Sequence, residues 1–296
     1  MEIRVLQYFL AVAREQTISG AAEKLHLTQP TLSRQLKELE DSLGKQLFVR
    51  GSRKITLTEE GMFLRKRAEQ ITELAQRTEN EIKNSDDVLS GDIYIGAGES
   101  DAIRKLASSA RHIRNNYPDV RFHIYSGDNE DVLDRLDKGL MDFGLIFTPV
   151  DADKYEYIKM PVVDEWGILM RKDLPLAEKE AIKPSDLWDK PLMVSREFSE
   201  NSDIVKWLGK DPKELNISGT YNLVFNGSVM ADEGLGYVLT FKKLINVTGE
   251  TNLCFRPLEP PLYAPMHLVW KKYQPMTRTA AKWLEIFKND ILHKIP

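Results

Sequence analysis

One short stretch near the N-terminus carries side chains that could bind DNA. Residues 27–40 have the sequence LTQPTLSRQLKELE, which is mostly polar apart from its leucines. In a helix, one face would present hydroxyl, amide, guanidinium and ammonium groups beside a proline: Gln29, Pro30, Thr31, Ser33, Arg34 and Lys37. Such groups donate hydrogen bonds to base edges and phosphates, and one guanidinium can hold a guanine through two hydrogen bonds. A solvated helix surface would also be polar, so the neighbouring segments have to decide between these interpretations.

The leucines of this stretch predict how the polar face is held. They recur at spacings of four, three and four residues: Leu32, Leu36, Leu39 and Leu43. That spacing places them on one side of an α-helix, which we expect to be buried. Thr28 is suited to cap the helix, and Pro30 fits the first turn, where a missing N–H has no helical partner. We therefore predict a helix that begins near Gln29.

Flanking segments complete the pattern of a winged helix-turn-helix. Ser19 precedes a short helix, GAAEKLH, whose small alanines allow close contact with the helix that follows. The runs QLFVR and ITLT around the turn GSRK predict a two-stranded hairpin, the wing. Arg53 and Lys54 at its tip are expected to lie along a minor groove or the DNA backbone, although surface hairpins also carry such residues for solubility. We assign residues 1–58 to this DNA-binding domain.

A long linker helix is predicted over residues 59–88. After Gly61 this stretch contains neither Gly nor Pro, and its two initial glutamates favour a helix N-terminus. Small and apolar residues alternate four and three positions apart: Leu64, Ala68, Ile71, Ala75, Thr78 and Ile82. A narrow apolar seam of this kind favours pairing with a second copy of the helix. The alternative is that the seam packs against the protein's own body.

The remaining residues, 89–296, alternate between strand and helix patterns. Strand, helix, strand, helix and strand in succession predict a parallel sheet with right-handed crossovers. A second unit of this kind begins near Val162, and the last strand and helix are expected to return to the first unit. The prediction is two α/β lobes that are connected twice and enclose a cleft. The first lobe covers about residues 91–161 and 266–296, the second about 162–265, and a ligand cleft lies between them.

The apolar stretches, cysteines, histidines and charges of the chain indicate which classes of protein it could belong to. The N-terminus has no apolar core of a signal peptide, and no apolar stretch is long enough to cross a membrane, so we expect a cytoplasmic protein. Cys254 is the single cysteine, which excludes an internal disulfide, and the five histidines lack metal-ligand spacing. The net charge is −4, but residues 1–58 carry nine basic against six acidic side chains, so the excess positive charge lies where DNA contact is predicted. We expect no metal, cofactor or catalytic residue.

In this order of parts, the chain resembles the LysR-type transcriptional regulators. The resemblance extends over the whole chain and is most specific in AAEKLHLTQPTLSRQLKELEDSLGKQLFVR followed by ITLTEEG. It implies that the helix at 29–37 enters the major groove of promoter DNA, with Gln29, Thr31 and Arg34 nearest the bases. Ser33, Lys37 and Arg53 would then hold phosphates, and Pro30 would touch a thymine methyl or a sugar. It also implies that the C-terminal part is a bilobed α/β effector-binding domain, like a periplasmic binding protein in fold, and that the protein forms a homodimer or homotetramer.

The same resemblance implies a small-molecule effector between the lobes. The matching positions lie at strand ends and helix starts, where we expect backbone N–H groups to be free to meet a ligand. They are Gly98, Glu99, Ser100, Asp101, Ser126, Gly127, Asp128, Phe147, Thr148, Ser195, Arg196, Asn226, Gly227 and Ser228. Family members that bind simple carboxylates tend to offer Ser and Thr in the first two loops, whereas this chain has Glu99, Asp101 and Asp128. We therefore expect an effector that is neutral or carries an amino group. The alternative is that these carboxylates cap helices or face solvent.

Enzymes, solute-binding proteins and protein-contact modules are the alternatives to this function. A dinucleotide enzyme is disfavoured because GAGESD has Asp101 where the fingerprint needs its third glycine, and a serine hydrolase lacks the G-x-S-x-G elbow. A pure solute-binding protein would leave the N-terminal module unexplained and would need a secretion signal. A helix-turn-helix used only for protein contact stays open, and DNA binding would distinguish it.

Overall fold

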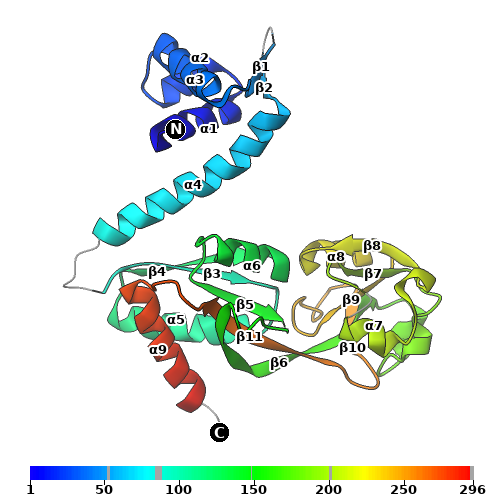
Figure 1. Ribbon diagram of the computed structural model, residues 1–296. Helices are drawn as coiled ribbons and strands as arrows, with labels where there is room; N and C mark the ends of the chain where they lie inside the picture. The colour runs from blue at the N-terminus through cyan, green and yellow to red at the C-terminus, as the bar shows by residue number, and fades with distance from the viewer. Residues whose placement is uncertain (52–53, 84–88, 148, 200–201, 294–296) are drawn as a thin grey trace. The chain divides into compact units, whose positions relative to one another are not determined.

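The N-terminal residues fold into a helical unit with a small hairpin. The computed structural model describes residues 1–51, 54–83, 89–147, 149–199 and 202–293, and the chain divides into two compact units, Met1–Ser85 and Asp86–Pro296. The elements of the first unit are α1 (Ile3–Glu15), α2 (Ile18–Lys24), α3 (Gln29–Leu43), β1 (Phe48–Arg50), β2 (Ile55–Leu57) and α4 (Glu59–Lys83) (Figure 1). β1 and β2 pair antiparallel, as expected for a wing. The predicted winged helix-turn-helix is confirmed.

Caps and buried leucines position α3. The Thr28 hydroxyl accepts the Thr31 N–H at 3.4 Å, and Gly44 ends the helix in the left-handed conformation with φ 63°. Leu32, Leu36 and Leu39 are buried in the core of the unit. Leu43, however, is 43% exposed, because the helix ends there and the chain turns away; its predicted burial was wrong. The helix before α3 also begins earlier than predicted, at Ile18, with Thr17 as its cap in place of Ser19.

The linker helix α4 divides into two parts. Leu64 and Ala68 are buried in the core formed by α1, α2 and α3, so this part of the predicted seam packs on the protein's own body. Ile71 is 38% exposed and Ile82 is 79% exposed. The prediction of one continuous partner surface was therefore wrong for the first two positions, because α1 covers them.

The C-terminal unit is built on one mixed sheet. Its first strands are β3 (Gly91–Ala97), β4 (Val120–Ser126) and β5 (Phe143–Phe147), with helices α5 (Ile103–Asn116) and α6 (Asn129–Asp137) between them. β3 lies between β4 and β5 and is parallel to both, as the alternating pattern predicted. The last strand, β11 (Tyr263–Lys271), returns to pair with β5, and α9 (Arg278–His293) packs Trp283 and Phe287 into the same core. We call this part lobe 1.

Lobe 2 contains the second parallel set. Its elements are β7 (Leu192–Ser195), α7 (Asp203–Leu208), β8 (Ile217–Tyr221), α8 (Val224–Asp232), β9 (Tyr237–Phe241) and β10 (Leu253–Pro257), with short 3₁₀ turns at Pro175–Glu178, Pro184–Asp186 and Pro212–Glu214. β7 lies between β8 and β9 and is parallel to both. A separate apolar core, which includes Ile168, Leu192 and Leu239, stabilises it.

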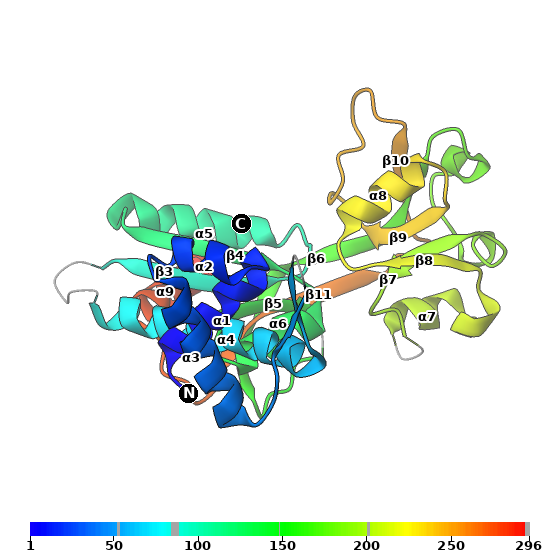
Figure 2. The same cartoon turned by 90° about the horizontal axis from the view of Figure 1, so that it is seen from above.

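Two long strands join the lobes. β6 (Tyr155–Arg171) pairs with β11 through its first part and with β9 and β10 through its last part, and Figure 2 shows both β6 and β11 passing from one lobe to the other. The change of lobe predicted near Val162 thus falls inside a continuous strand. The bilobed α/β architecture is confirmed, while the residue limits given for the lobes remain a prediction. No helix among the described residues is long and apolar enough to cross a membrane.

Candidate DNA-binding face and inter-lobe site

The polar face of α3 is open to solvent. Gln29, Pro30, Thr31, Arg34 and Lys37 are exposed, and Ser33 is half-buried. The buried leucines lie on the opposite side, so the core of the unit fixes which side chains face outward. The structure thus brings the predicted contact residues of α3 together on one surface. Arg53 lies outside the described residues.

Several of these side chains already have partners within the unit. The Ser19 hydroxyl donates to the Gln29 Oε1 at 3.2 Å, which links α2 to the start of α3. The hydroxyls of Thr28 and Thr31 are 2.8 Å apart, and Arg34 Nε lies 3.7 Å from Glu38 Oε1. The Arg34–Glu38 pair is exposed on both sides, so it holds the guanidinium only weakly. The Arg34 side chain is therefore free to exchange Glu38 for another acceptor.

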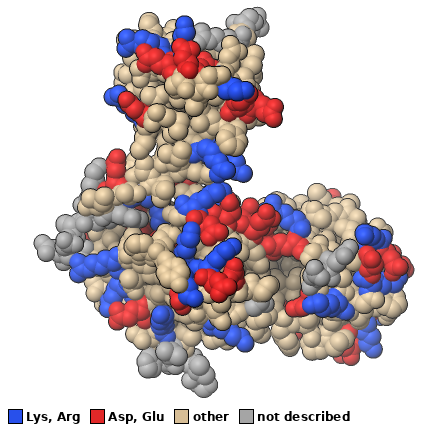
Figure 3. Space-filling model, in the orientation of Figure 1, with Lys and Arg blue, Asp and Glu red and all other residues tan. Residues whose placement is uncertain are grey.

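Figure 3 shows one face of the C-terminal unit with its charged side chains coloured. Acidic and basic side chains are interspersed over that face of the unit. Phosphate binding depends on clustered positive charge. That face therefore shows no cluster of positive charge among its described residues.

A carboxylate of lobe 1 caps a helix of lobe 2. Glu99, two residues after β3, accepts the N–H of Val224, the first residue of α8. The N-cap position of α8 is Leu223, which has no side-chain acceptor to satisfy the free amides of the first turn. Glu99 supplies the acceptor that the helix lacks.

Lobe 2 makes the equivalent contact to lobe 1. Glu197 Oε1 accepts the N–H of Asn129, the first residue of α6, at 2.8 Å. The adjacent Arg196 donates from Nε to Asp128 and from Nη2 to Asp131 at 2.6 Å. Asp128 is also the N-cap of α6, since its Oδ1 accepts the Asp131 N–H at 3.0 Å. The first turn of α6 is thus held by its own aspartate and by two residues of the opposite lobe.

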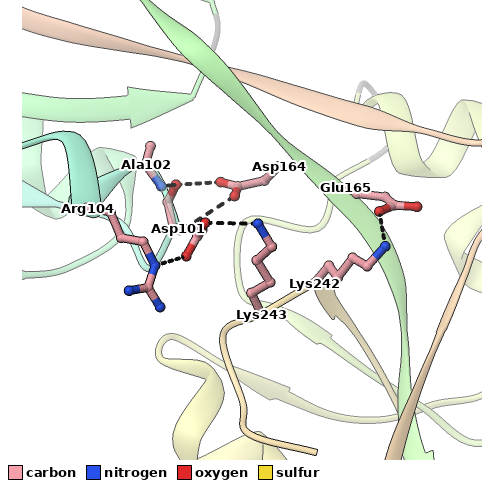
Figure 4. Close-up of polar contacts among 8 residues, drawn as sticks. Asp101, Ala102, Arg104, Asp164, Glu165, Lys242 and Lys243 are labelled. Atoms are coloured by element: carbon pink, nitrogen blue, oxygen red, sulfur yellow. Dashed lines mark hydrogen bonds and ion pairs between the residues drawn. The ribbon is translucent and has the colours of Figure 1, made fainter. Parts of the chain in front are cut away.

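A third group of contacts lies where β6 passes between the lobes (Figure 4). The buried Asp164 accepts the Ser100 hydroxyl at 2.5 Å and the Asp101 N–H at 3.3 Å. Asp101 pairs with Arg104 at 2.5 Å and, across the lobes, with Lys243 at 3.3 Å. Beside them, Lys242 donates to Glu165 at 2.7 Å. We call the cross-lobe contacts made by Glu99, Glu197, Arg196 and Lys243 the inter-lobe junction.

The carboxylates of the junction fall into two electrostatic groups. Burial raises the pKa of Glu99, Glu197 and Asp164, which accept N–H or O–H groups rather than direct bonds from a cation. Burial would also raise the pKa of Asp101 and Asp128, but their hydrogen-bonded cations outweigh it and hold both below the ordinary range. Two of the three acidic side chains on which the predicted effector chemistry rested are therefore already neutralised.

Aromatic side chains continue the contact between the lobes. The rings of Phe147, at the end of β5, and Phe241, at the end of β9, are 4.9 Å apart. Phe241 in turn lies 4.2 Å from the ring of Trp166 on β6. The polar junction therefore adjoins an apolar surface that both lobes share.

The predicted effector residues divide between the junction and the two lobes' own frameworks. Six of them meet around the junction: Glu99, Ser100, Asp101, Asp128, Phe147 and Arg196. The expectation of free backbone amides was wrong for two glycines, because the Gly98 and Gly127 N–H groups bond to Leu145 and Ala97 in the sheet. It was also wrong for Ser228, the fifth residue of α8, whereas Gly227 is the fourth residue of that helix.

The other predicted positions have simpler surroundings. Asn226 is exposed in the first turn of α8, Ser126 is exposed at the end of β4, and the Ser195 hydroxyl accepts the Glu197 N–H at 3.3 Å. Thr148 lies outside the described residues.

Sequence reasoning missed Glu197, Val224, Asp164 and Lys243. A signal for Glu197 existed, since it follows its strand by two residues as Glu99 does.

A metal site needs several ligating side chains close together. Within the described ranges, no group of three or more His, Cys, Asp or Glu side chains is arranged to hold a metal ion. The side chains of the junction bind one lobe to the other through hydrogen bonds and ion pairs, and tilted aromatic rings adjoin them.

Comparison with known proteins assigns both units. Residues 3–62 match the family described as bacterial regulatory helix-turn-helix protein, lysR family, and residues 86–291 match the LysR substrate binding domain. The chain belongs to the LysR family. The Hca operon transcriptional activator HcaR of Escherichia coli (strain K12) is 30% identical to this LysR-family protein over 285 residues, 92% of each chain.

Other relatives match over shorter segments. The regulator BsdA of Bacillus subtilis (strain 168) is 35% identical over 158 residues, which is 53% of this chain and 54% of BsdA. The chain thus spans about half the length of that relative, and 63% of the E. coli regulator OxyR. Two solved structures of CbnR, a LysR family transcriptional regulator, have the same fold at 18% identity. Their TM-scores are 0.76 for the protein (covering 98% of this chain and 99% of CbnR) and 0.74 for its complex with target DNA (98% and 100%).

Proposed function

We propose that this protein regulates transcription by binding promoter DNA through α3, and that a small molecule bound between the lobes alters that binding. The exposed face of α3 opposite its buried leucines carries the first part of the proposal. Gln29, Thr31 and Arg34 would contact base edges, and Pro30 a thymine methyl or sugar. Ser33, Lys37 and Arg53 would hold phosphates. Because bacterial promoters lie in the cytoplasm, this function would place the protein there.

The test is binding to the DNA immediately upstream of the protein's own coding region. The full chain, Arg34→Ala and the charge-matched control Arg111→Ala would be titrated against that DNA and a scrambled duplex at one near-physiological salt concentration. Salt must be fixed because phosphate binding alone depends steeply on it. We expect Arg34→Ala to lose preference for the upstream DNA by about 1–3 kcal/mol and Arg111→Ala to keep it. An equal loss on both duplexes would assign Arg34 to the backbone. If the wild-type chain binds the upstream DNA no better than the scrambled duplex, genome-wide selection of bound fragments would distinguish an operator elsewhere from a role in protein contact alone.

We infer that the effector is neutral or carries an amino group. Glu99 supports this, since it is half-buried at the junction and its hydrogen bond comes from a backbone amide rather than a cation. An anionic ligand would face that carboxylate in a partly desolvated site. A thermal-shift screen should find stabilising compounds among amines and neutral molecules. Stabilisation by simple dicarboxylates alone would overturn the inference.

We also infer that the protein self-associates through the exposed part of α4. Ile71, Leu74 and Ile82 are exposed large apolar residues on this helix, which supports a partner beyond the unit's own core. A homodimer would present two α3 helices to a roughly two-fold symmetric operator, and a homotetramer is the larger assembly that family membership suggests.

A thiol-based response to peroxide is a weaker candidate. Several relatives are named hydrogen peroxide-inducible genes activators. Here the one cysteine, Cys254, is buried in β10, and burial raises the pKa of its thiol. Reaction with peroxide requires an accessible thiolate. The environment of Cys254 therefore supports a packing role.

A further inference from the structure

We propose that Glu99 and Glu197 form a reciprocal latch, in which each lobe caps a helix of the other and so holds the lobes together without a ligand. Glu99 of lobe 1 accepts the first amide of α8, and Glu197 of lobe 2 accepts the first amide of α6. Each glutamate is the second residue after the central strand of its parallel set, β3 or β7. Each of these two amides has a protein acceptor while the lobes are together. If the lobes separated, both amides would be hydrogen-bonded only to water.

The first half of the latch replaces a missing cap. α8 begins after Leu223, which has no capping side chain, so the opposite lobe provides the acceptor. A carboxylate is the favoured acceptor at this position, because the helix dipole and the unpaired N–H groups both attract negative charge. Separation of the lobes therefore removes the cap of α8 as well as one hydrogen bond.

The second half of the latch is reinforced by charge. Arg196, which precedes Glu197, grips both Asp128 and Asp131 in the first turn of α6. The guanidinium of Arg196 thus binds two carboxylates at the start of α6, and the carboxylate of Glu197 accepts an N–H of the same turn. A sliding movement would break both contacts together, so this half specifies the register of the closed state.

The regulatory part of this proposal rests on the proposed function. A small molecule that enters the junction has to contact, or displace, the groups that close it. Its binding would then change the balance between latched and open chains, because a ligand shifts an equilibrium only by binding the two states unequally.

The latch can be tested in the full chain by measuring the separation of the lobes. Spin labels on Arg111→Cys in lobe 1 and Glu180→Cys in lobe 2, with Cys254→Ala, would report the distance distribution by pulsed electron resonance. Labelled chains would be diluted with excess unlabelled protein to remove distances between copies. The test variant is Glu99→Ala/Glu197→Ala, and the control Asp119→Ala/Glu214→Ala removes two exposed carboxylates elsewhere in the same lobes.

The latch predicts a shift without added ligand. The ratio of open to latched chains should rise by about tenfold for each charge-assisted hydrogen bond lost, while the control keeps the wild-type distribution. Glu99→Gln/Glu197→Gln retains acceptor oxygens but not the negative charges. Its ratio of open to latched chains should lie between that of the alanine variant and that of the control. An unchanged distribution in the alanine variant would overturn the latch, and an equal change in the control would assign the effect to charge alone.

Binding to the upstream DNA separates failure of the latch from failure of the proposed function. If the lobes open in the alanine variant and its footprint on that DNA also changes, the latch is part of regulation. If the lobes open and the footprint stays that of the wild type, the latch stands and its regulatory role is overturned. Failure of the wild-type chain to prefer that DNA, with none selected genome-wide, would overturn the proposed function and leave the distance measurement valid.

Discussion

Glu99 and Glu197 occupy equivalent places in the two lobes. Each lies two residues beyond a strand that sits between two parallel neighbours, and each accepts the first N–H of a helix in the opposite lobe. The two contacts are thus related by exchange of the lobes. This relationship suggests that the junction acts as one unit, so that a change on either side weakens both.

Removing the backbone N–H of Val224 should weaken the latch without changing any charged side chain. Proline suits the first position of α8, and Leu223 already has the extended backbone, φ −123° and ψ 132°, that precedes proline. Val224→Pro should therefore retain the helix and increase the separation of the lobes in the spin-label measurement. Val224→Ala loses buried side-chain volume but keeps the N–H, and it serves as the matched control. Equal separation in both variants would contradict the prediction.

Lys37 and Arg34 should respond differently to substitution. We expect Lys37→Ala to weaken binding to every duplex to a similar extent, because an ammonium near phosphates contributes without regard to sequence. The slope of log affinity against log salt concentration should fall by about one for Lys37→Ala. Titrations at several salt concentrations would measure it, with Lys24→Ala on α2 as a control for charge. If Lys37→Ala lost affinity only for the upstream DNA, the contact of Lys37 would be assigned to a base edge instead of a phosphate.

The Asp128–Arg196 pair predicts a pH-dependent contribution to stability. Burial acts to raise the pKa of Asp128, but Arg196 and the α6 amides outweigh it, so the folded-state pKa lies below the ordinary 3.8. A depressed carboxyl pKa stabilises the fold above the ordinary value, and this contribution is lost as pH falls through the folded-state pKa. Asp128→Asn keeps a capping side chain and removes the charge.

Chemical denaturation at several pH values measures this contribution. The free energy of unfolding should differ between wild type and Asp128→Asn by about 1 kcal/mol at neutral pH, since Arg196 is 45% exposed and water screens the pair. The difference should stay constant down to about pH 5 and shrink below the ordinary pKa of the aspartate. Asp134→Asn, in an exposed pair with Lys138, should show a smaller difference. A difference that grows on acidification would contradict the assignment.

The exposed part of α4 should control self-association. Ile71→Ser/Ile82→Ser removes two exposed apolar side chains without disturbing the buried Leu64 and Ala68. Sedimentation equilibrium should show a lower association constant for this variant, because less apolar surface is buried between copies. Lys66→Ser changes an exposed residue earlier in the same helix and should associate as the wild type does. Unchanged association of the double variant would locate the contact elsewhere.

Local patterns predicted the elements well, and the junction poorly. Leucine spacing, Thr28 and Pro30 were sufficient for α3, because a helix start and its buried face depend on nearby residues. The alternation of strand and helix also predicted the parallel sets. The partnership of Glu99 with Val224 could not be predicted, since it joins residues 125 positions apart through the packing of two lobes. The burial of Leu64 and Ala68 likewise depends on where α1 lies.

The crossing strands limit how the lobes can move. β6 is a single strand of 17 residues, and its register with β11 shifts between Pro265 and His267, where proline has no N–H to donate. An extended strand is already close to the maximum length that its backbone allows, whereas two-stranded ribbons twist more than wider sheets do. The lobes therefore cannot slide apart along β6 while both strands stay paired, and the available motion is torsion about the ribbon. A change at the junction would therefore rotate one lobe relative to the other about the β6–β11 ribbon.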